Sequence, residues 1–486
     1  MNLELFLPEL VLAIFAVLVI LLDLFIERKG VLAVFSIIGL VISAAFAVVM
    51  PISPVQSIFN NMLAVDGFAV FFKMLFPFIA ALVILSSTDY VSRLSRFRGE
   101  YYALILLSTL GMMLMAAATE LISIYIALEL TSISLYALVG LLKDSKSSES
   151  SLKYLLLGAI ASAVLLYGMA LVFGVTGQTH LGEIARVIRT MALTSTLDNP
   201  ALILGIVLMI AGFGFKIAAV PFHMWVPDVY EGAPTPVTAY LSVASKSVGF
   251  AVIIRVFYSA FETSDWLSLN WAAIFAVLAA IGMSVGNITA LSQTNIKRMM
   301  GYSSIAQAGY LMVGLAVMGI SPPADTLGQS TIIFFLTSYT LANLGAFAAI
   351  IAISGKLDSD LINDYSGMVK RAPLLSLALT LCLISLIGMP PAAGFIAKFY
   401  IFSGAVQNGL LWLVIIAVIN SVISAYYYLR VVKVMWFGEP ASDERIPSSG
   451  ALRFALFISC LGVLALGIIP NSVIQLTEVA ARMFTP

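Results

Sequence analysis

Residues 212–230 read GFGFKIAAVPFHMWVPDVY. This stretch carries Lys216 and two prolines inside a segment that is otherwise long and apolar enough to span a membrane. Proline removes a backbone donor and clashes with the preceding turn, so the stretch predicts a helix that breaks within the membrane. Residues 388–398, which read GMPPAAGFIAK and end at Lys398, predict a second break. Because broken backbone at this depth is tolerated only inside protein or beside a wet cavity, both breaks indicate a transport site.

The composition around these breaks is that of a polytopic membrane protein. Of the 486 residues, 61% are hydrophobic and only 10% are charged. A spanning helix needs roughly 20 apolar residues, and about 14 such runs follow one another along the chain. We therefore predict an all-α fold in which transmembrane helices 7 and 12 are discontinuous. The runs lie near residues 3–26, 30–50, 68–88, 100–118, 121–142, 150–173, 201–230, 236–260, 268–291, 298–319, 329–354, 374–406, 408–436 and 451–470.

The two predicted breaks are five spans apart, and each lies near a lysine. Corresponding breaks in the two halves of a chain are typical of an internal structural repeat whose transport site lies at the discontinuous helices. The halves share no direct sequence identity, so this spacing alone carries the hypothesis of a repeat.

Basic residues gather in alternate loops, which predicts the orientation of the chain. By the positive-inside rule the basic loops face the cytoplasm, and both termini face outward across the plasma (inner) membrane. The basic residues are Arg28, Lys29, Arg93, Arg96, Arg98, Lys143, Lys146, Lys297, Arg298, Lys356, Lys370, Arg371 and Arg445. The opposite loops without Lys or Arg are 51–67, 261–267, 320–328 and 407–408. The exception is 174–200, with Arg186 and Arg189, which we interpret as an amphipathic surface helix.

Four ionisable side chains lie in the middle of predicted spans: Glu129, Lys216, Lys246 and Lys398. Placing such a side chain at the bilayer centre costs about 2.5–3.5 kcal/mol on insertion scales, so the default interpretation is an ion or proton pathway. Lysine suits proton transfer because its pKa moves readily on burial, whereas arginine cannot release its proton. These four residues are therefore the predicted proton relay.

The neighbours of two of these residues refine the prediction. Glu129 is flanked by apolar residues, so its expected partner is a buried lysine. Such a pair would act as a switch, because protonation of one member changes the proton affinity of the other; a static ion pair is the alternative. Lys246 lies among Ser242, Ser245 and Ser247, whose hydroxyls could hold water beside the amine.

Other ionisable residues are weaker candidates. For Lys153, near the cytoplasmic end of its span, both snorkelling and a functional role stay open. His223 lies in the first break, where it either relays protons or bonds a freed carbonyl. Lys73, Asp23 and Arg255 lie near span ends, and we interpret all three as snorkelling side chains.

The chain has few of the residues that hold redox centres or nucleotides. Cys382 and Cys460 form no CxxC pair, and the only histidines are His180 and His223. No Gly-rich nucleotide fingerprint is present, and the net charge of zero gives no basic patch for nucleic acid. We therefore expect no cofactor, metal or nucleic acid to be bound by this chain.

Four stretches resemble the antiporter-like membrane subunits of respiratory complex I. They are YIALEL at 125–130, FKIAAVPFHMWVPD at 215–228 followed by YEGAPTP at 230–236, NIKRMMGYSS at 295–304, and GMPPAAGFIAK at 388–398. The resemblance extends over nearly the whole chain, and the second and fourth stretches are the specific ones. Within the group, the chain resembles the N-type subunits, because it has Lys398 where the M-type subunits carry a glutamate.

The resemblance implies a fourteen-helix bundle with two inverted five-helix repeats. Its expected parts are residues 1–99 with helices 1–3, 100–265 with helices 4–8, 266–436 with helices 9–13, and 437–486 with helix 14. It also implies roles for six residues: Glu129 and Lys216 form the switching pair, Lys246 is the central relay, Lys398 is the proton site of the far half, and Lys153 and His223 support them.

The implied function is proton translocation in an NADH:quinone oxidoreductase, coupled to quinone reduction in partner subunits. NADH or another electron donor, flavin, iron–sulfur clusters and quinone would all be handled by those subunits. Neighbouring antiporter-like and small helical membrane subunits, and the lipid bilayer, are the expected partners. Two alternatives stay open: a subunit of a multisubunit sodium/proton antiporter, and a stand-alone permease or membrane scaffold.

Overall fold

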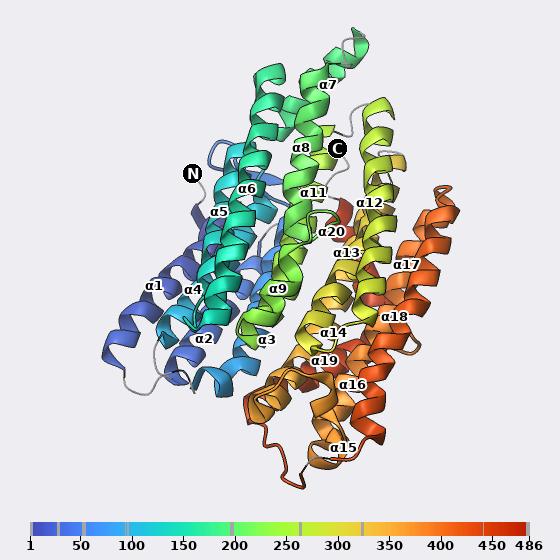
Figure 1. The fold of residues 1–486 in the computed structure, drawn as a ribbon. Helices are drawn as coiled ribbons and strands as arrows, with labels where there is room; N and C mark the ends of the chain where they lie inside the picture. The colour runs from blue at the N-terminus through green and yellow to red at the C-terminus, as the bar shows by residue number, and fades with distance from the viewer. Residues whose placement is uncertain are drawn as a thin grey trace.

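Long helices dominate the structure, a computed structural model that describes residues 3–26, 30–50, 55–92, 94, 97–194, 199–261, 265–321, 325–440 and 442–482. The helices run roughly side by side in an elongated bundle (Figure 1). Four of the basic residues used to predict the orientation lie outside the described residues: Arg28, Lys29, Arg93 and Arg96.

Thirteen continuous helices in the described ranges are long and apolar enough to cross a membrane. The twelfth expected span is made of two shorter helices, α16 (Pro373–Ile387) and α17 (Ala393–Gln407), which confirms the predicted polytopic fold. The others contain α1 (Leu7–Phe25), α2 (Gly30–Val48), α3 (Gly67–Ser92), α4 (Arg98–Ala117), α5 (Leu121–Val139), α6 (Ser145–Thr176), α8 (Pro200–Ile217), α10 (Thr235–Tyr240) continuing through a π-helical turn (Leu241–Ser245) into α11 (Lys246–Phe261), α12 (Asp265–Leu291), α13 (Ile296–Ile320), α14 (Leu327–Leu357), α18 (Leu411–Phe437) and α19 (Gly450–Ile468).

Short elements connect and complete the long helices. The surface helix predicted within 174–200 is α7 (Leu181–Leu193), which buries Leu181, Ile184 and Ile188 and lies at the upper end in Figure 1. The remaining elements are 3-10 turns at Leu3–Phe6 and Ile362–Tyr365, the antiparallel strands β1 (Gln56–Ile58) and β2 (Leu63–Val65), α9 (Trp225–Gly232), α15 (Met368–Arg371) and α20 (Asn471–Ala481).

Both predicted breaks are present. α8 ends at Ile217, where Ala218 adopts a left-handed conformation with φ of 62°, and the chain becomes helical again only at Trp225. The carbonyl of Phe215, which has lost its α-helical bond, accepts from the indole N–H of Trp225 at 3.0 Å and from the backbone N–H of Ala218 at 3.2 Å. α16 ends at Ile387 because Gly388 has φ of 89°, a conformation that glycine adopts without steric cost. The backbone N–H of Gly394 then donates to Ser385 Oγ at 3.1 Å.

Besides the breaks, a pairing between the start of one helix and a later loop occurs twice along the chain. The start of α5 pairs with the loop after α6, where Leu121 N donates to Thr179 O at 3.0 Å. The start of α13 pairs in the same way with the loop after α14, where Ile296 N donates to Asp360 O at 2.8 Å. Such recurrence is what an internal repeat predicts. The repeat boundaries at 100–265 and 266–436 remain predictions.

Burial places the helix that carries Lys246 at the centre. The span Thr235–Phe261, which contains Lys246, is buried throughout, whereas α1, α6 and α19 expose many apolar side chains. An apolar exposed surface is expected of helices that face lipid or other membrane helices. The Lys246 helix is thus separated from lipid by the helices around it.

Close packing of α12 against α13 depends on glycine. A Cβ added at Gly286 would lie 2.6 Å from the backbone nitrogen of Ala306 on α13. In the reverse direction, a Cβ at Gly309 would lie 2.6 Å from the backbone nitrogen of Met283 on α12. Since both contacts are to backbone, neither can be relieved by a side-chain rotation.

Gly286→Ala is therefore expected to destabilise the protein by about 1–3 kcal/mol, because the two helices must move apart. The control is Gly174→Ala on α6, where an added Cβ meets nothing within 4 Å. Thermal unfolding of both variants in detergent checks the difference. Equal midpoints for the two variants would contradict the close packing.

Candidate functional site

Lys216 lies at the end of α8, beside the first break, with only 5% of its surface exposed. Its ammonium donates to Ser132 Oγ on α5 at 3.0 Å. Its stem packs on Gly249 of α11, where an added Cβ would lie 3.4 Å from Lys216 Cγ. The missing side chain at Gly249 thus brings Lys216 close to the helix that carries Lys246.

Glu129 lies on α5 one helical turn before Ser132 and is half-buried. Its carboxylate accepts a hydrogen bond from Ser162 Oγ on α6. Within the described ranges Glu129 and Lys216 make no direct ion pair; the lysine instead binds Ser132, three residues after Glu129 on α5. The pairing of Glu129 with Lys216 therefore stays a prediction.

Lys246 is the first residue of α11, directly after the π-helical turn, and is 3% exposed. Its ammonium donates to the hydroxyl of Ser304 on α13 at 2.7 Å and also to the carbonyl of Ser304. The hydroxyl of Ser247, next to the lysine, is buried without a hydrogen-bond partner in the part of the chain that the structure describes. Single π-helical turns within α-helices are frequent at functional sites.

Lys398 lies on α17, beyond the second break, and is 5% exposed. Its ammonium donates to the carbonyl of Ile387, the last residue of α16, at 2.8 Å, and to Ser421 Oγ at 2.9 Å. It also lies 4.5 Å from the centre of the Tyr310 ring, a favourable cation–π contact. The break therefore supplies the free carbonyl that holds the buried amine.

Lys153 and His223 lie apart from these buried groups. Lys153 is 45% exposed and pairs with Glu149 at 2.8 Å and with Asp228 at 2.9 Å. His223 is half-buried in the first break, and its Nδ1 makes no hydrogen bond with any described residue. Lys153 is therefore part of a surface cluster at the end of α9.

This cluster links both halves of the chain at the end where the predicted cytoplasmic loops lie. Arg298 of α13 pairs with Asp228 at 2.8 Å and with Glu231 at 3.1 Å. Lys146 of α6 pairs with Glu231 at 3.2 Å. The segment that follows the first break is thus held between α6 and α13.

Comparison with known proteins settles the family. The transmembrane family described as "NADH:quinone oxidoreductase/Mrp antiporter, TM" matches residues 118–424. The protein named NADH-quinone oxidoreductase subunit N from Dehalococcoides mccartyi is 51% identical over 485 residues, which cover 99% of each chain. This chain belongs to the NADH-quinone oxidoreductase subunit N family.

Solved structures agree with the subunit N family fold. A chain in the structure of respiratory complex I from Thermus thermophilus with bound aureothin is 32% identical, with a TM-score of 0.81 over 96% of this chain and 98% of that one. A chain of the Mrp complex from Dietzia sp. has a TM-score of 0.86 at 21% identity, over 100% of this chain and 98% of that one. The second likeness shows the fold only.

Two residues interpreted as snorkelling from the sequence are instead buried and paired. Lys73 is 1% exposed and forms an ion pair with Glu9 of α1 at 2.8 Å. Arg255 is 3% exposed and pairs with Asp66, just before α3, at 2.7 Å. The snorkelling interpretation was wrong for both, because their partners lie on distant segments that the local pattern does not reveal. For Asp23, which is half-buried, it stays a prediction.

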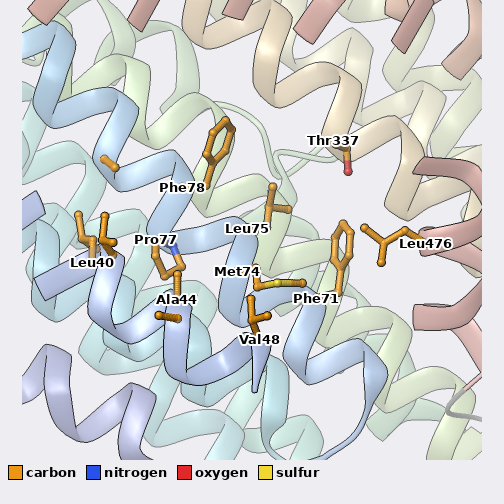
Figure 2. Close-up of a pocket in the computed structure, with 13 residues that line it drawn as sticks. Leu40, Ala44, Val48, Phe71, Met74, Leu75, Pro77, Phe78, Thr337 and Leu476 are labelled. Atoms are coloured by element: carbon orange, nitrogen blue, oxygen red, sulfur yellow. The ribbon is translucent and has the colours of Figure 1, made fainter. Parts of the chain in front are cut away.

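A groove of about 620 Å³, whose lining includes no lysine, lies between α2, α3, α14 and α20 (Figure 2). Its lining is apolar except for Thr337 and contains no ionisable side chain. It therefore offers no group that could hold a proton. Among the described residues, no group of three or more His, Cys, Asp or Glu side chains is placed to hold a metal ion.

The Glu9–Lys73 pair gives a prediction about stability. Lys73→Met should destabilise the protein by about 3–5 kcal/mol, because it leaves a buried carboxylate without its partner. The double variant Glu9→Gln/Lys73→Met removes both charges and should be less destabilised. Thermal unfolding in detergent compares the two, and a double variant no more stable than the single one would contradict a buried pair.

Proposed function

We propose that this member of the subunit N family moves protons across the membrane through Glu129, Lys216, Lys246 and Lys398, as part of a bacterial NADH:quinone oxidoreductase. The observation that carries the proposal is the placement of three buried lysine amines at two helix breaks and a π-helical turn, each hydrogen-bonded to a hydroxyl. Hydroxyls can both accept and donate a proton, so each amine has a neighbour that can pass one on.

Each residue has a distinct role in this proposal. Glu129 and Lys216 form the switching pair, in which Ser132 bridges the carboxylate helix and the amine. Lys246 is the central relay, since it binds Ser304 on α13 and so joins the two predicted repeats. Lys398 is the proton site of the far half. Lys153 supports the site by holding Asp228 after the first break, and His223 lies within that break.

Moving one proton against 100 mV requires about 2.3 kcal/mol, which must come from partner subunits. The electron donor, flavin, iron–sulfur clusters and quinone of the complex are handled by those subunits, and the chain acts as an enzyme only as part of the whole. Its partners are the neighbouring membrane subunits. Energy reaches the relay as a change in local charge or conformation, because a proton on one group alters the affinity of the next.

A multisubunit sodium/proton antiporter is the second candidate, favoured by the family description, which also names the Mrp antiporter, and by the shared fold of the Mrp complex. The relative named subunit N is 51% identical over nearly the full length, against 21% for the Mrp chain, which supports the first candidate. Mass spectrometry of the purified native complex distinguishes the two. Quinone oxidoreductase companions support the proposal, and cation antiporter companions alone would reject it.

The first functional prediction concerns Lys216. Lys216→Ala should lower the number of protons pumped per electron pair by about tenfold or more, while the complex still assembles. Lys216→Arg should not restore pumping, because guanidinium keeps its proton. Lys356→Ala, at an exposed lysine paired with Glu444, is the control and should pump normally. Normal pumping by the Arg variant would reject a titrating role.

The second concerns orientation, with both termini outside. In a Cys382→Ser/Cys460→Ser background, Leu193→Cys at the end of α7 and Ser148→Cys at the start of α6 both present exposed thiols. A membrane-impermeant maleimide added from outside should label only position 193, and after permeabilisation both. Labelling of position 148 alone from outside would invert the predicted orientation.

A further inference from the structure

Ser304 is the meeting point of a buried group of hydroxyls around Lys246. Besides the lysine, its Oγ accepts a hydrogen bond from the hydroxyl of Tyr339 on α14 at 3.2 Å. The hydroxyl of Tyr230 on α9 lies 3.1 Å away. The Lys246 amine also lies 5.4 Å from the centre of the Tyr339 ring. Tyr339 is 2% exposed, so its hydroxyl has no access to bulk water.

Tyr339 also lines a small cavity that reaches Lys398. The other polar residues of the lining are Gln307, Ser338 and Ser385. The volume open to a water is about 10 Å³, which is enough for one molecule, and the polar lining offers it the hydrogen bonds it needs. An ammonium has three N–H groups, and Lys398 uses two of them on Ile387 O and Ser421 Oγ. The third N–H is available to the cavity.

We propose that Ser304 and Tyr339 are relay residues that pass a proton between Lys246 and Lys398, with one water in the cavity completing the connection. This inference rests on the proposed function and adds a route to it. The three groups that link the lysines are neutral, so the proton crosses between the predicted repeats without a further charged side chain.

The transfer balances without any other reactant. The Tyr339 hydroxyl, which donates to Ser304 Oγ in the structure, first turns toward the cavity and donates to the water. An N–H bond of the Lys246 ammonium then breaks as its proton joins Ser304 Oγ, which gives its own proton to the Tyr339 oxygen. The Tyr339 hydroxyl gives its proton to the water, and the water gives one to the Lys398 amine. Lys246 ends neutral and Lys398 ends charged, while both hydroxyls and the water are regenerated with their hydrogen bonds reversed.

The arrangement also explains why the relay needs a tyrosine at position 339. Tyr339 spans from Ser304 to the cavity, which a serine or threonine in its place is too short to do. A phenylalanine would keep the shape and the contact of the ring with Lys246 but lose the hydroxyl. Tyr339→Phe therefore separates proton transfer from packing.

The test uses the intact complex reconstituted in liposomes, in which proton uptake and quinone reduction are measured together. Tyr339→Phe and Ser304→Ala should each lower pumping by about tenfold, with the complex assembled. The control is Tyr240→Phe, because Tyr240 is as buried as Tyr339 and its hydroxyl is bonded to Ser108 and Thr109 on α4. The ratio of pumping rates in H2O and D2O should change for the two relay variants and not for Tyr240→Phe.

The outcomes separate this inference from the proposed function. Loss of pumping in Lys246→Ala and Lys398→Ala, with normal pumping and an unchanged isotope ratio in Tyr339→Phe and Ser304→Ala, would overturn the relay alone. Normal pumping in both lysine variants would overturn the proposed function as well. Equal losses in Tyr339→Phe and Tyr240→Phe, with no change in the isotope ratio, would assign Tyr339 a packing role and reject the relay.

Discussion

The need to hydrogen-bond every polar group inside a membrane underlies the arrangement of this protein. Hydrocarbon offers no partner to a freed carbonyl or to an ammonium, so each break and each lysine must be satisfied from within the chain. The contact between Lys398 and Ile387 O at 2.8 Å meets both needs together. The break leaves a carbonyl without its helical partner, and the amine that binds it gains a place in the interior. Helix interruption and buried charge therefore stabilise one another.

Much of this could be predicted from the sequence because it depends on local chemistry. The span lengths, the two breaks and the lysines beside them follow from apolar runs, proline and glycine. The partners of the lysines could not be predicted, since Ser132 is 84 positions from Lys216 and Ser304 is 58 from Lys246. The same limit explains the errors at Lys73 and Arg255. A charge near a span end has the same local sequence whether it reaches water or meets Glu9 or Asp66 on another segment.

The two broken spans differ in which group hydrogen-bonds the carbonyl at the break. In the first, the lysine precedes the break, and the indole of Trp225 binds the freed carbonyl of Phe215. In the second, the lysine follows the break and binds the freed carbonyl itself. Lys216 is consequently left to bind a hydroxyl on α5, near Glu129, whereas Lys398 remains within the second half. This difference gives the two lysines unlike surroundings despite the similar breaks.

The bonds between the predicted repeats limit how this chain can move. At one end of the bundle, Arg298 forms an ion pair with Asp228. In the interior, Lys246 binds Ser304, and Asn343 binds Ser242. Tilting one half as a rigid body against the other would break several of these contacts, at about 1–3 kcal/mol for each buried group left unpaired. The proposed proton transfer therefore requires only rotation of hydroxyls and shifts of lysine side chains, while the two halves of the bundle stay nearly fixed relative to each other.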